Sequence, residues 1–340
     1  MVSDAAPTTR LLEMLDGYRV VQALHAAAQI GIADLLADGP QSSEALAQAS
    51  GTHTPSLRRL LRALASLDVL EEQPDGRFAL TALGAQLRSD VPGSLRAAVL
   101  FYGGRRHWTA WGGLHECVRT GGTAFGARSP TAFADMAARD PAGAATFNEA
   151  MAALTGAVNA SVVAAYDFSR FTTLVDVGGG YGALLAGILR ATPGLRGTVF
   201  EIPPVVEGAR EHIAAAGLAD RCEVVGGDAF AAIPAGADAY TFKSILHDWD
   251  DASSTTLLTN CRAAIGAGGT LLIVERVLPE HAAPAAGATA FLADLNMLLL
   301  TGGRERTEAE FRALFAAAGF SLVRIIPTGT PQSIIEAVPA

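Results

Sequence analysis

The segment from Thr173 to Glu201 limits the possible folds of this 340-residue chain more than any other. A short apolar run ends in the loop GGGYG at residues 178–182, a helical segment follows, and a second apolar run stops at Glu201. This order of strand, glycine turn, helix, strand and terminal carboxylate is typical of half a nucleotide-binding α/β fold. The segment therefore predicts a site where the backbone closes tightly on a ligand and a carboxylate meets a ribose hydroxyl.

Two classes of ligand fit the glycine loop. The spacing that begins at Gly178 satisfies the dinucleotide fingerprint G-x-G-x-x-G/A, and Glu201 follows about 20 residues later, as that fingerprint requires. Asp176 precedes the first glycine, where it would repel a pyrophosphate but attract the ammonium and sulfonium groups of S-adenosylmethionine. Asp228, after the third apolar run, adds an acid near the adenine edge. These acids favour S-adenosylmethionine over a dinucleotide, and over a βα turn without a ligand.

The region after Thr172 alternates strand-like and helical segments, which predicts a mostly parallel sheet covered on both faces. The helix before the sixth run starts at a capping box, Thr307 to Glu310, and ends before Gly319. Only residues 327–332 separate the last two runs, so these strands must pair antiparallel. A parallel sheet with one reversed strand at the end is typical of a Rossmann-like, seven-stranded methyltransferase domain. The seven runs cover residues 173–177, 197–200, 222–225, 238–242, 270–274, 320–326 and 333–337.

Residues 1–100 have a different pattern, with helices and one small hairpin. Apolar positions recur at helical spacing over 11–36, a short helix is expected over 43–49, and another starts at Pro55. A hairpin with the tip Pro-Asp-Gly at 74–76 follows, so the order is that of a winged helix-turn-helix. Such a domain either reads DNA, through Arg58, Arg59 and Arg62 on its second helix, or forms a dimer through its apolar helices.

Charge and composition narrow these alternatives. The first 100 residues contain eight arginines and eleven acidic residues, and the whole chain has a net charge of −9, which disfavours a nucleic-acid or anionic membrane partner. The cysteines Cys117, Cys222 and Cys261 lack metal-ligand spacing and indicate a reducing compartment. The N-terminus has no pattern of an export signal, and charges interrupt the longest apolar stretches. We therefore expect a cytoplasmic location and no membrane span.

The segment after the fourth strand carries the candidate chemistry. Ligands bind at the carboxyl ends of parallel strands, so His247 should lie near the glycine loop, with Glu275 at the end of the fifth strand in the same rim. A histidine oriented by a carboxylate is the arrangement of a general base. The acids 248, 250 and 251 are more typical of a helix cap than of a metal site, and we expect no metal. Lys243, the single lysine of the chain, is either functional or incidental.

The chain resembles the S-adenosylmethionine-dependent O-methyltransferases of small molecules. The motifs that carry the resemblance, in order, are DVGGGYG, FEIP, GGDAF, LHDWDD, LLIVERVLP and GGRERTEAEF. The relevant branch includes plant caffeic acid and flavonoid enzymes and bacterial enzymes that tailor aromatic antibiotics. The resemblance covers nearly the whole chain, and implies a dimerisation domain over 1–100, a helical connecting region over 101–166 that contributes to the acceptor pocket, and a cofactor-binding domain over 167–340.

The resemblance also implies roles for individual residues. His247 is expected to be the catalytic base, with Glu275 and Glu305 as the acids that flank it. The expected cofactor contacts are Asp176, Gly178, Gly180, Glu201, Asp228, Ala229, Phe230 and Lys243. The expected acceptor contacts are Trp108, Phe147, Met151, Leu154, Asn296 and Met297, although Phe147 and Met151 also fit a plain helix core. Leu154 replaces a histidine that plant phenylpropanoid enzymes tend to carry, so a more apolar ring system is expected.

These expectations lead to a working hypothesis and two alternatives. The hypothesis is a homodimeric O-methyltransferase that transfers a methyl group to a hydroxyl of an aromatic small molecule, a polyketide-like or other secondary metabolite, with His247 as general base and without a metal. One alternative is a non-methylating relative that uses the bound cofactor for hydroxylation or decarboxylation, against which the intact His247 argues. The other is a cofactor-sensing DNA-binding regulator, which the charge distribution disfavours.

Overall fold

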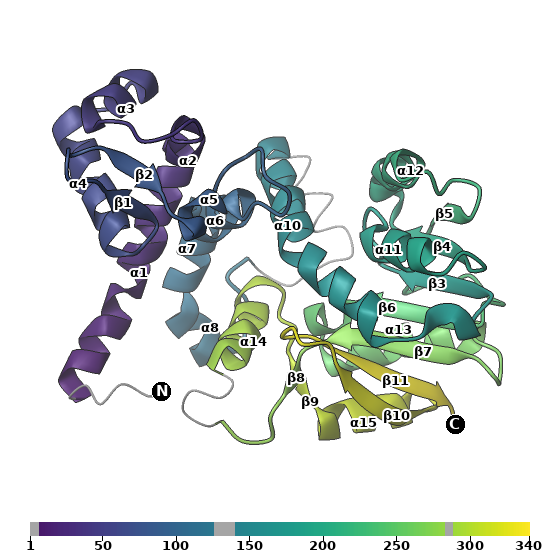
Figure 1. Cartoon of the computed structure of the whole chain (residues 1–340). Helices are drawn as coiled ribbons and strands as arrows, with labels where there is room; N and C mark the ends of the chain where they lie inside the picture. The colour runs from purple at the N-terminus through teal and green to yellow at the C-terminus, as the bar shows by residue number, and fades with distance from the viewer. Residues whose placement is uncertain (1–6, 126–139, 283–287) are drawn as a thin grey trace. The chain divides into compact units, whose positions relative to one another are not determined.

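The structure, a computed structural model, describes residues 7–125, 140–282 and 288–340 (Figure 1). The chain divides into two compact units. An N-terminal unit comprises Met1–Thr109 and Asp135–Thr155, and a sheet unit comprises Ala110–Ala134 and Gly156–Ala340. The long helix α10 (Pro141–Ala165) begins in the first unit and ends in the second. Among the described residues, no helix is both long and apolar enough to cross a bilayer.

The N-terminal unit is mostly helical, as predicted. Its short helices begin where polar side chains cap them, since Ser42 accepts from the backbone N–H of Ala45, and Thr81 accepts from that of Gly84. The helix–helix–hairpin order of the winged-helix prediction is present in α3, α4, β1 and β2. The elements are α1 (Pro7–Ile30), α2 (Ile32–Leu35), α3 (Ser43–Ser50), α4 (Thr54–Ser66), β1 (Leu70–Glu72), β2 (Phe78–Leu80), α5 (Ala82–Ala85) and α6 (Arg96–Gly103).

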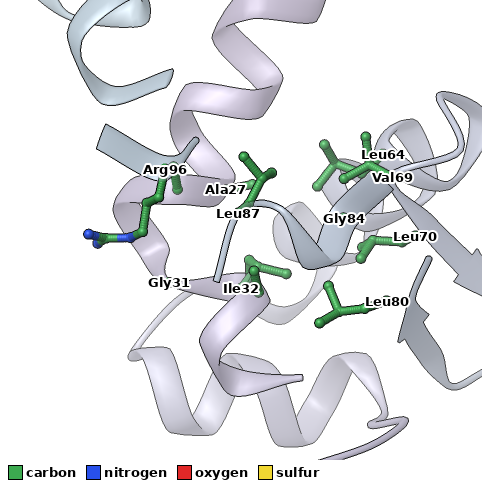
Figure 2. A pocket seen from close by; sticks show the side chains of 12 residues that line it. Ala27, Gly31, Ile32, Leu64, Val69, Leu70, Leu80, Gly84, Leu87 and Arg96 are labelled. Carbon is green, nitrogen blue, oxygen red and sulfur yellow. The ribbon is translucent and has the colours of Figure 1, made fainter. Parts of the chain in front are cut away.

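The arginines of α4 belong to a solvated face. Arg58 and Arg62 are exposed, and both pair with Glu72 on β1. Opposite them, Leu57, Leu61 and Leu64 are buried in the core of the unit. The cavity beside this core holds about 10 Å³ of space, room for no more than one water-sized sphere, and its lining is largely apolar (Figure 2). It is therefore too small for an organic ligand.

The sheet unit is built on seven strands in the order β10-β11-β7-β6-β3-β4-β5. The five strands from β7 to β5 are parallel, and β11 runs antiparallel between β10 and β7. The predicted seven-stranded sheet is confirmed, and its reversed strand lies second from the edge. The strands are β3 (Thr173–Val177), β4 (Arg196–Glu201), β5 (Cys222–Gly226), β6 (Ala239–Lys243), β7 (Thr270–Glu275), β10 (Phe320–Pro327) and β11 (Ser333–Pro339).

Two apolar cores lie on the two faces of this sheet. Side chains alternate between the faces, so Leu174 on β3 joins one core and Val175 joins the other. The first core includes residues of α10, α11 and α12, and the second includes residues of α13 and α15. Because helices cover both faces of the sheet, a ligand-binding site is expected at the carboxyl ends of the parallel strands.

The remaining helices and turns complete the described chain. They are α7 (Arg105–Gly112), α8 (Leu114–Thr120), η1 (Phe168–Arg170), α11 (Ala183–Ala191), η2 (Pro203–Val205), α12 (Val206–Ala215), η3 (Leu246–Asp248), α13 (Asp251–Ala264), α14 (Ala288–Leu300) and α15 (Glu308–Ala317). The predicted capping box at Thr307 and Glu310 is present at the start of α15. The sequence did not predict the small parallel pair β8 (Val277–Leu278) and β9 (Arg306–Thr307).

Candidate functional site

The glycine loop at the end of β3 has the backbone that its sequence predicts. Gly178, Gly180 and Gly182 all adopt positive φ angles of 68°, 58° and 79°, a region that favours glycine. A Cβ atom at Gly180 would meet nothing within 4 Å, so the backbone there faces open space. A Cβ at Gly178 would overlap Ile245, so the loop packs directly against the segment that leads to His247.

Two acids flank this loop, the buried Asp176 and the partly buried Glu201. Asp176, on β3, accepts a hydrogen bond of 2.7 Å from the hydroxyl of Thr241, and burial raises the pKa of its carboxyl to about 6. Glu201, at the end of β4, accepts the backbone N–H groups of Gly180 and Ile202 at 2.9 and 2.8 Å. Burial also raises the pKa of Glu201. Both carboxyl groups therefore lie beside the loop, Glu201 at the place that the fingerprint assigns to an acid and Asp176 on the strand that leads into the loop.

Lys243 ends β6 on the same face of the sheet as Asp176. The register pairs Asp176 with Thr241, and Lys243 follows two residues later on that face. Burial lowers the pKa of the Lys243 ammonium, while the charges of Asp176 and Glu275 oppose that change. The lysine thus belongs to the charged edge that surrounds the loop.

The segment after β5 forms the next part of this edge. Asp228 accepts the backbone N–H of Phe230 at 2.9 Å, which closes a tight turn. Asn260 on α13 donates to the carbonyls of Ala229 and Phe230 at 2.9 and 2.8 Å, so the turn is tied to a helix of the core. The ring of Phe230 meets that of Trp249 edge to face at 4.7 Å. This contact joins the Asp228 turn to the His247 segment.

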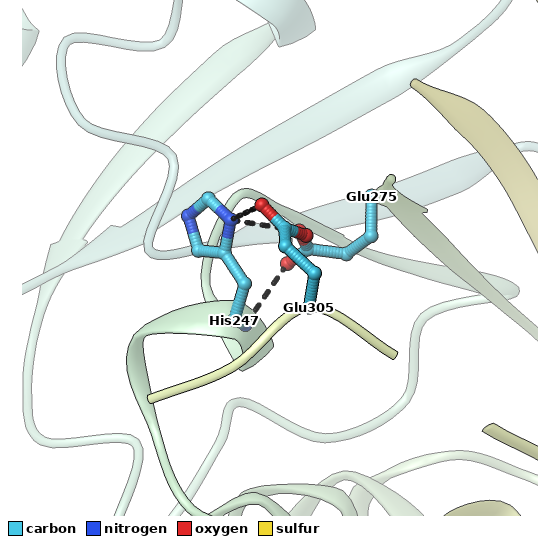
Figure 3. A group of neighbouring side chains, drawn as sticks. All are labelled: His247, Glu275 and Glu305. Atoms are coloured by element: carbon cyan, nitrogen blue, oxygen red, sulfur yellow. Dashed lines mark hydrogen bonds and ion pairs between the residues drawn. The ribbon is translucent and has the colours of Figure 1, made fainter. Parts of the chain in front are cut away.

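His247 lies in the turn η3 with one ring nitrogen against two acids (Figure 3). Its Nδ1 is 3.2 Å from Glu305 Oε1, within hydrogen-bond distance, and 3.3 Å from Glu275 Oε2. Both acids are buried, and the His247 side chain is 17% exposed. Because a carboxylate oxygen accepts, Nδ1 is the donor, and a neutral imidazole then keeps its lone pair on Nε2.

Opposing effects set the protonation of this cluster. Burial lowers the pKa of His247, but the charges of Glu275 and Glu305 outweigh it and raise the pKa to about 10. Burial raises the pKa of Glu275 to about 7, although His247 partly offsets that rise. The imidazolium form of His247 is therefore favoured at neutral pH.

The predicted acceptor residues fall in both units. In the N-terminal unit, the ring of Phe147 meets that of Phe101 at 5.4 Å, Trp108 is half-exposed beside Tyr18, and Met151 and Leu154 are partly buried. In the sheet unit, Asn296 accepts a hydrogen bond of 3.2 Å from the indole N–H of Trp111, and Met297 is partly buried. The predicted acceptor residues thus lie in two different units, and a pocket that they share stays a prediction.

Comparisons with known proteins identify the family of this chain. The O-methyltransferase domain family matches residues 111–321, and the O-methyltransferase dimerisation domain matches residues 12–90. The chain is 46% identical over 329 residues to a phenazine O-methyltransferase of Lysobacter antibioticus, covering 97% of this chain and 95% of that one. The chain belongs to the O-methyltransferase family.

Other members of the family extend the comparison. The mitomycin biosynthesis 6-O-methyltransferase of Streptomyces lavendulae is 41% identical over 334 residues, covering 98% of this chain and 95% of that one. The structure of human N-acetylserotonin methyltransferase in complex with S-adenosylmethionine is 31% identical, with a TM-score of 0.88 over the full length of both chains. This chain is an O-methyltransferase of the type that tailors antibiotics and other secondary metabolites.

The cofactor of this O-methyltransferase is S-adenosylmethionine, and the loop residues fit it. The open backbone at Gly180 leaves room for a ligand, while the acids Asp176 and Glu201 provide acceptors for cationic and hydroxyl groups. A pyrophosphate would instead meet the buried carboxylate of Asp176. The carboxyl groups at the loop therefore agree with S-adenosylmethionine, the cofactor that the sequence favoured.

The structure also reveals partners that the sequence analysis did not single out. Thr241 holds Asp176, Trp111 holds Asn296, and Arg306 binds the His247 turn from β9. Arg306 stands directly after Glu305 in the motif GGRERTEAEF, but an arginine in a surface-like run of charges gives no signal of burial.

Proposed function

We propose that this O-methyltransferase methylates a hydroxyl group of an aromatic small molecule, with His247 as the general base and without a metal ion. The orientation of His247 carries the proposal. Its Nδ1 faces Glu305 and Glu275, so Nε2 is the atom available to an acceptor hydroxyl. A base whose other nitrogen is held by carboxylates has a fixed tautomer and a stabilised protonated form.

The chemistry follows from the matched acidity of base and acceptor. S-adenosylmethionine, when bound, supplies a methyl group on a sulfonium. A free phenol has a pKa of about 10, and the pKa of His247 is raised to about 10. A proton can therefore pass from the acceptor hydroxyl to Nε2 at little cost, and Glu275 and Glu305 stabilise the imidazolium that results. At neutral pH the favoured state is an imidazolium beside a neutral phenol. The proposed transfer needs a neutral imidazole, so this state must first lose one proton. The rate should therefore rise with pH.

We assign the residues around the base in the same proposal. Gly178 contacts the amino-acid end of the cofactor, Glu201 its ribose, and the turn from Asp228 to Phe230 its adenine. Asp176, Gly180 and Lys243 complete the cofactor contacts. The acceptor contacts are Trp108, Phe147, Met151, Leu154, Asn296 and Met297, with Leu154 favouring an apolar ring system. The similarity to a phenazine O-methyltransferase supports a fused-ring aromatic acceptor.

The metal-free scheme has one structural competitor. The ligand atoms of His247, Glu275 and Glu305 lie within 4.8 Å of one another, a spacing that could hold a metal ion. However, Glu275 Oε1 already lies within 3.4 Å of the backbone N–H groups of residues 245, 246 and 247. A metal at this place would also displace the Nδ1–H that Glu305 accepts. We therefore propose that the cluster orients a base.

A homodimer is the second part of the proposal. Helix α1 exposes a series of apolar side chains between Leu11 and Val21, and this helix lies largely within the matched dimerisation domain. A monomer that exposed them would be prone to association, because apolar surface gains free energy when it is buried. The exposed side chains are Leu11, Leu12, Met14, Leu15, Tyr18 and Val21. We propose residues 1–100 as the dimerisation domain, 101–166 as the connecting region and 167–340 as the cofactor-binding domain.

The decisive experiment measures methyl transfer from labelled S-adenosylmethionine to a panel of hydroxylated phenazines, quinones and naphthoates, with and without EDTA. We expect a methylated product whose yield EDTA does not change. Loss of product in EDTA, restored by one divalent metal, would overturn the metal-free scheme. Cofactor binding by calorimetry without product from any acceptor would favour a non-methylating relative that hydroxylates or decarboxylates.

A further inference from the structure

Arg306, on β9, is the largest fully buried side chain among the described residues, with 1% of its side chain exposed. Removing a guanidinium from water costs several kcal/mol unless its donors find acceptors. The burial of this guanidinium therefore depends on the acceptors that surround it. The residues that accept from it show which segment it binds.

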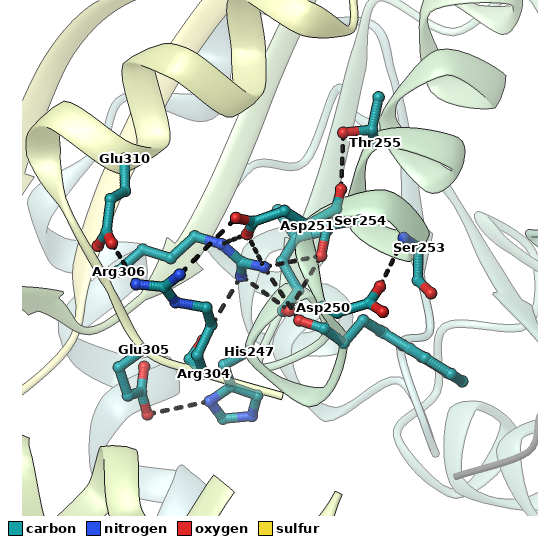
Figure 4. Close-up of polar contacts among 12 residues, drawn as sticks. His247, Asp250, Asp251, Ser253, Ser254, Thr255, Arg304, Glu305, Arg306 and Glu310 are labelled. Atoms are coloured by element: carbon teal, nitrogen blue, oxygen red, sulfur yellow. Dashed lines mark hydrogen bonds and ion pairs between the residues drawn. The ribbon is translucent and has the colours of Figure 1, made fainter. Parts of the chain in front are cut away.

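The acceptors of Arg306 include two carbonyls of the turn that carries His247 and two side chains at the start of α13 (Figure 4). Its Nη1 donates to the carbonyl of Leu246 and its Nη2 to that of Trp249, both at 3.0 Å. These two carbonyls stand on either side of His247 and Asp248. The guanidinium also donates to Asp251 Oδ1 at 2.9 Å through Nε, and to Ser254 Oγ at 3.1 Å through Nη2. One planar group thus bridges the turn η3 and the first turns of α13.

The same turn is held from its other side by Glu275. The Oε1 atom of Glu275 accepts the backbone N–H groups of Ile245 and Leu246, both at 3.0 Å. Gly303 adds a steric contact, because a Cβ atom there would overlap the carbonyl of His247. The N–H groups of the turn are therefore bound by a carboxylate and its carbonyls by a guanidinium, while the backbone of the 303–306 segment packs against it.

We propose that Arg306 is a positioning residue that holds the His247 turn so that Nδ1 stays against Glu275 and Glu305. This inference rests on the proposed role of His247. Without the guanidinium, the carbonyls of Leu246 and Trp249 lose their donor and the turn can shift. The imidazole then moves away from the two acids, and its pKa falls towards the ordinary value of a histidine.

The test compares Arg306→Lys with the matched control Arg312→Lys in the full chain. A lysine keeps the charge but cannot bridge two carbonyls as a planar guanidinium does. Arg312 is exposed on α15 and pairs with Glu308, away from the His247 turn. The pKa of His247 is measured directly by NMR titration of labelled histidine, with the signal assigned from His247→Gln. Turnover and the Kd of S-adenosylmethionine are measured in parallel.

We expect the pKa of His247 to fall by about 1 or more towards 6.5 in Arg306→Lys, and to stay unchanged in Arg312→Lys. Turnover should fall by roughly 10-fold or more, while the Kd of S-adenosylmethionine changes by less than about threefold. An unchanged pKa of His247 in a folded Arg306→Lys protein overturns the inference, even if turnover falls. A fall in this pKa supports it even if the wild type methylates no acceptor, in which case the proposed function alone fails.

A milder variant covers the case in which Arg306→Lys does not fold. Ser254→Ala removes an acceptor of Arg306 Nη2 and a hydroxyl that lies 3.3 Å from the carbonyl of Leu246. We expect a smaller fall in the pKa of His247 in the same direction, with normal cofactor binding. A folded Ser254→Ala protein whose His247 titrates as in the wild type would count against the positioning role.

Discussion

Glu305 Oε1 lies 3.2 Å from Nδ1 of His247, although 58 positions separate the two residues along the chain. The acid lies just before β9 and the histidine in the turn after β6, and each is held by further bonds. The backbone N–H of Glu305 donates to Asp294 Oδ1 at 2.8 Å, which ties the acid to α14. The contact therefore joins three separate segments and leaves Nε2 of His247 as the reactive atom in the proposed scheme.

Replacing His247 by alanine should lower turnover by roughly 100-fold or more, the scale of a lost general base. Its Nδ1 contacts Glu305 and Glu275 rather than the glycine loop, so the Kd of S-adenosylmethionine should change less than about threefold. Steady-state kinetics with a phenolic acceptor and calorimetry measure the two quantities. His212→Ala, on the exposed face of α12, is the control. Unchanged turnover in His247→Ala would remove His247 as the base.

Replacing Glu275 or Glu305 by glutamine should move the rising limb of the pH–rate profile to lower pH. Burial lowers the pKa of His247, and the two carboxylates raise it to about 10. Removing one negative charge destabilises the imidazolium, so the proton leaves at lower pH. The profile of kcat/KM between pH 5.5 and about 10 with one acceptor gives the limb. The control Glu308→Gln, on the surface of α15, should leave the rising limb at the wild-type pH. A limb that moves to higher pH in Glu275→Gln would contradict the role of Glu275 in stabilising the imidazolium of His247.

Replacing Asp176 by asparagine should weaken S-adenosylmethionine binding by about 10-fold or more at pH 7.5, because it removes a negative charge close to the cationic cofactor. Burial raises the pKa of Asp176 to about 6. Wild-type affinity should therefore fall as the pH decreases through 6, because the acid must lose a proton to attract the cationic cofactor. The variant should lack that dependence. Calorimetry between pH 5 and 8 measures both effects, with the exposed Asp220→Asn as control; equal affinities would exclude Asp176 from the cofactor site.

Replacing Leu11 and Leu15 together by glutamate should convert the proposed dimer to a monomer. Both side chains are exposed on α1, and each charge placed in an apolar interface would cost several kcal/mol. Light scattering at micromolar concentration gives the mass. The control is Leu83→Glu, which changes another exposed leucine of the same unit and should remain dimeric. A wild-type protein that is monomeric at this concentration would refute the dimer itself.

The order of the elements could be read from the sequence because it depends on short-range signals. The run from Thr173 to Val177 is a strand in the structure, and Thr307 and Glu310 form the predicted capping box. Gly178 and Gly180 adopt positive φ angles where the loop turns. Periodicity, capping and backbone strain act over a few residues, so one sequence contains enough information to predict them.

The partners of the site depended on tertiary structure. Sequence reasoning placed His247 and Glu275 at one rim because parallel strands end together, but the burial of Arg306 and its bonds to the His247 turn had no local signal. The same holds for Thr241, which binds Asp176 only because β6 lies beside β3. The sequence by itself determined the strands, the glycine loop and the likeness to a methyltransferase. The packing of distant segments decided which polar groups face each other, because a buried charge takes its partners from whatever the closed sheet brings near.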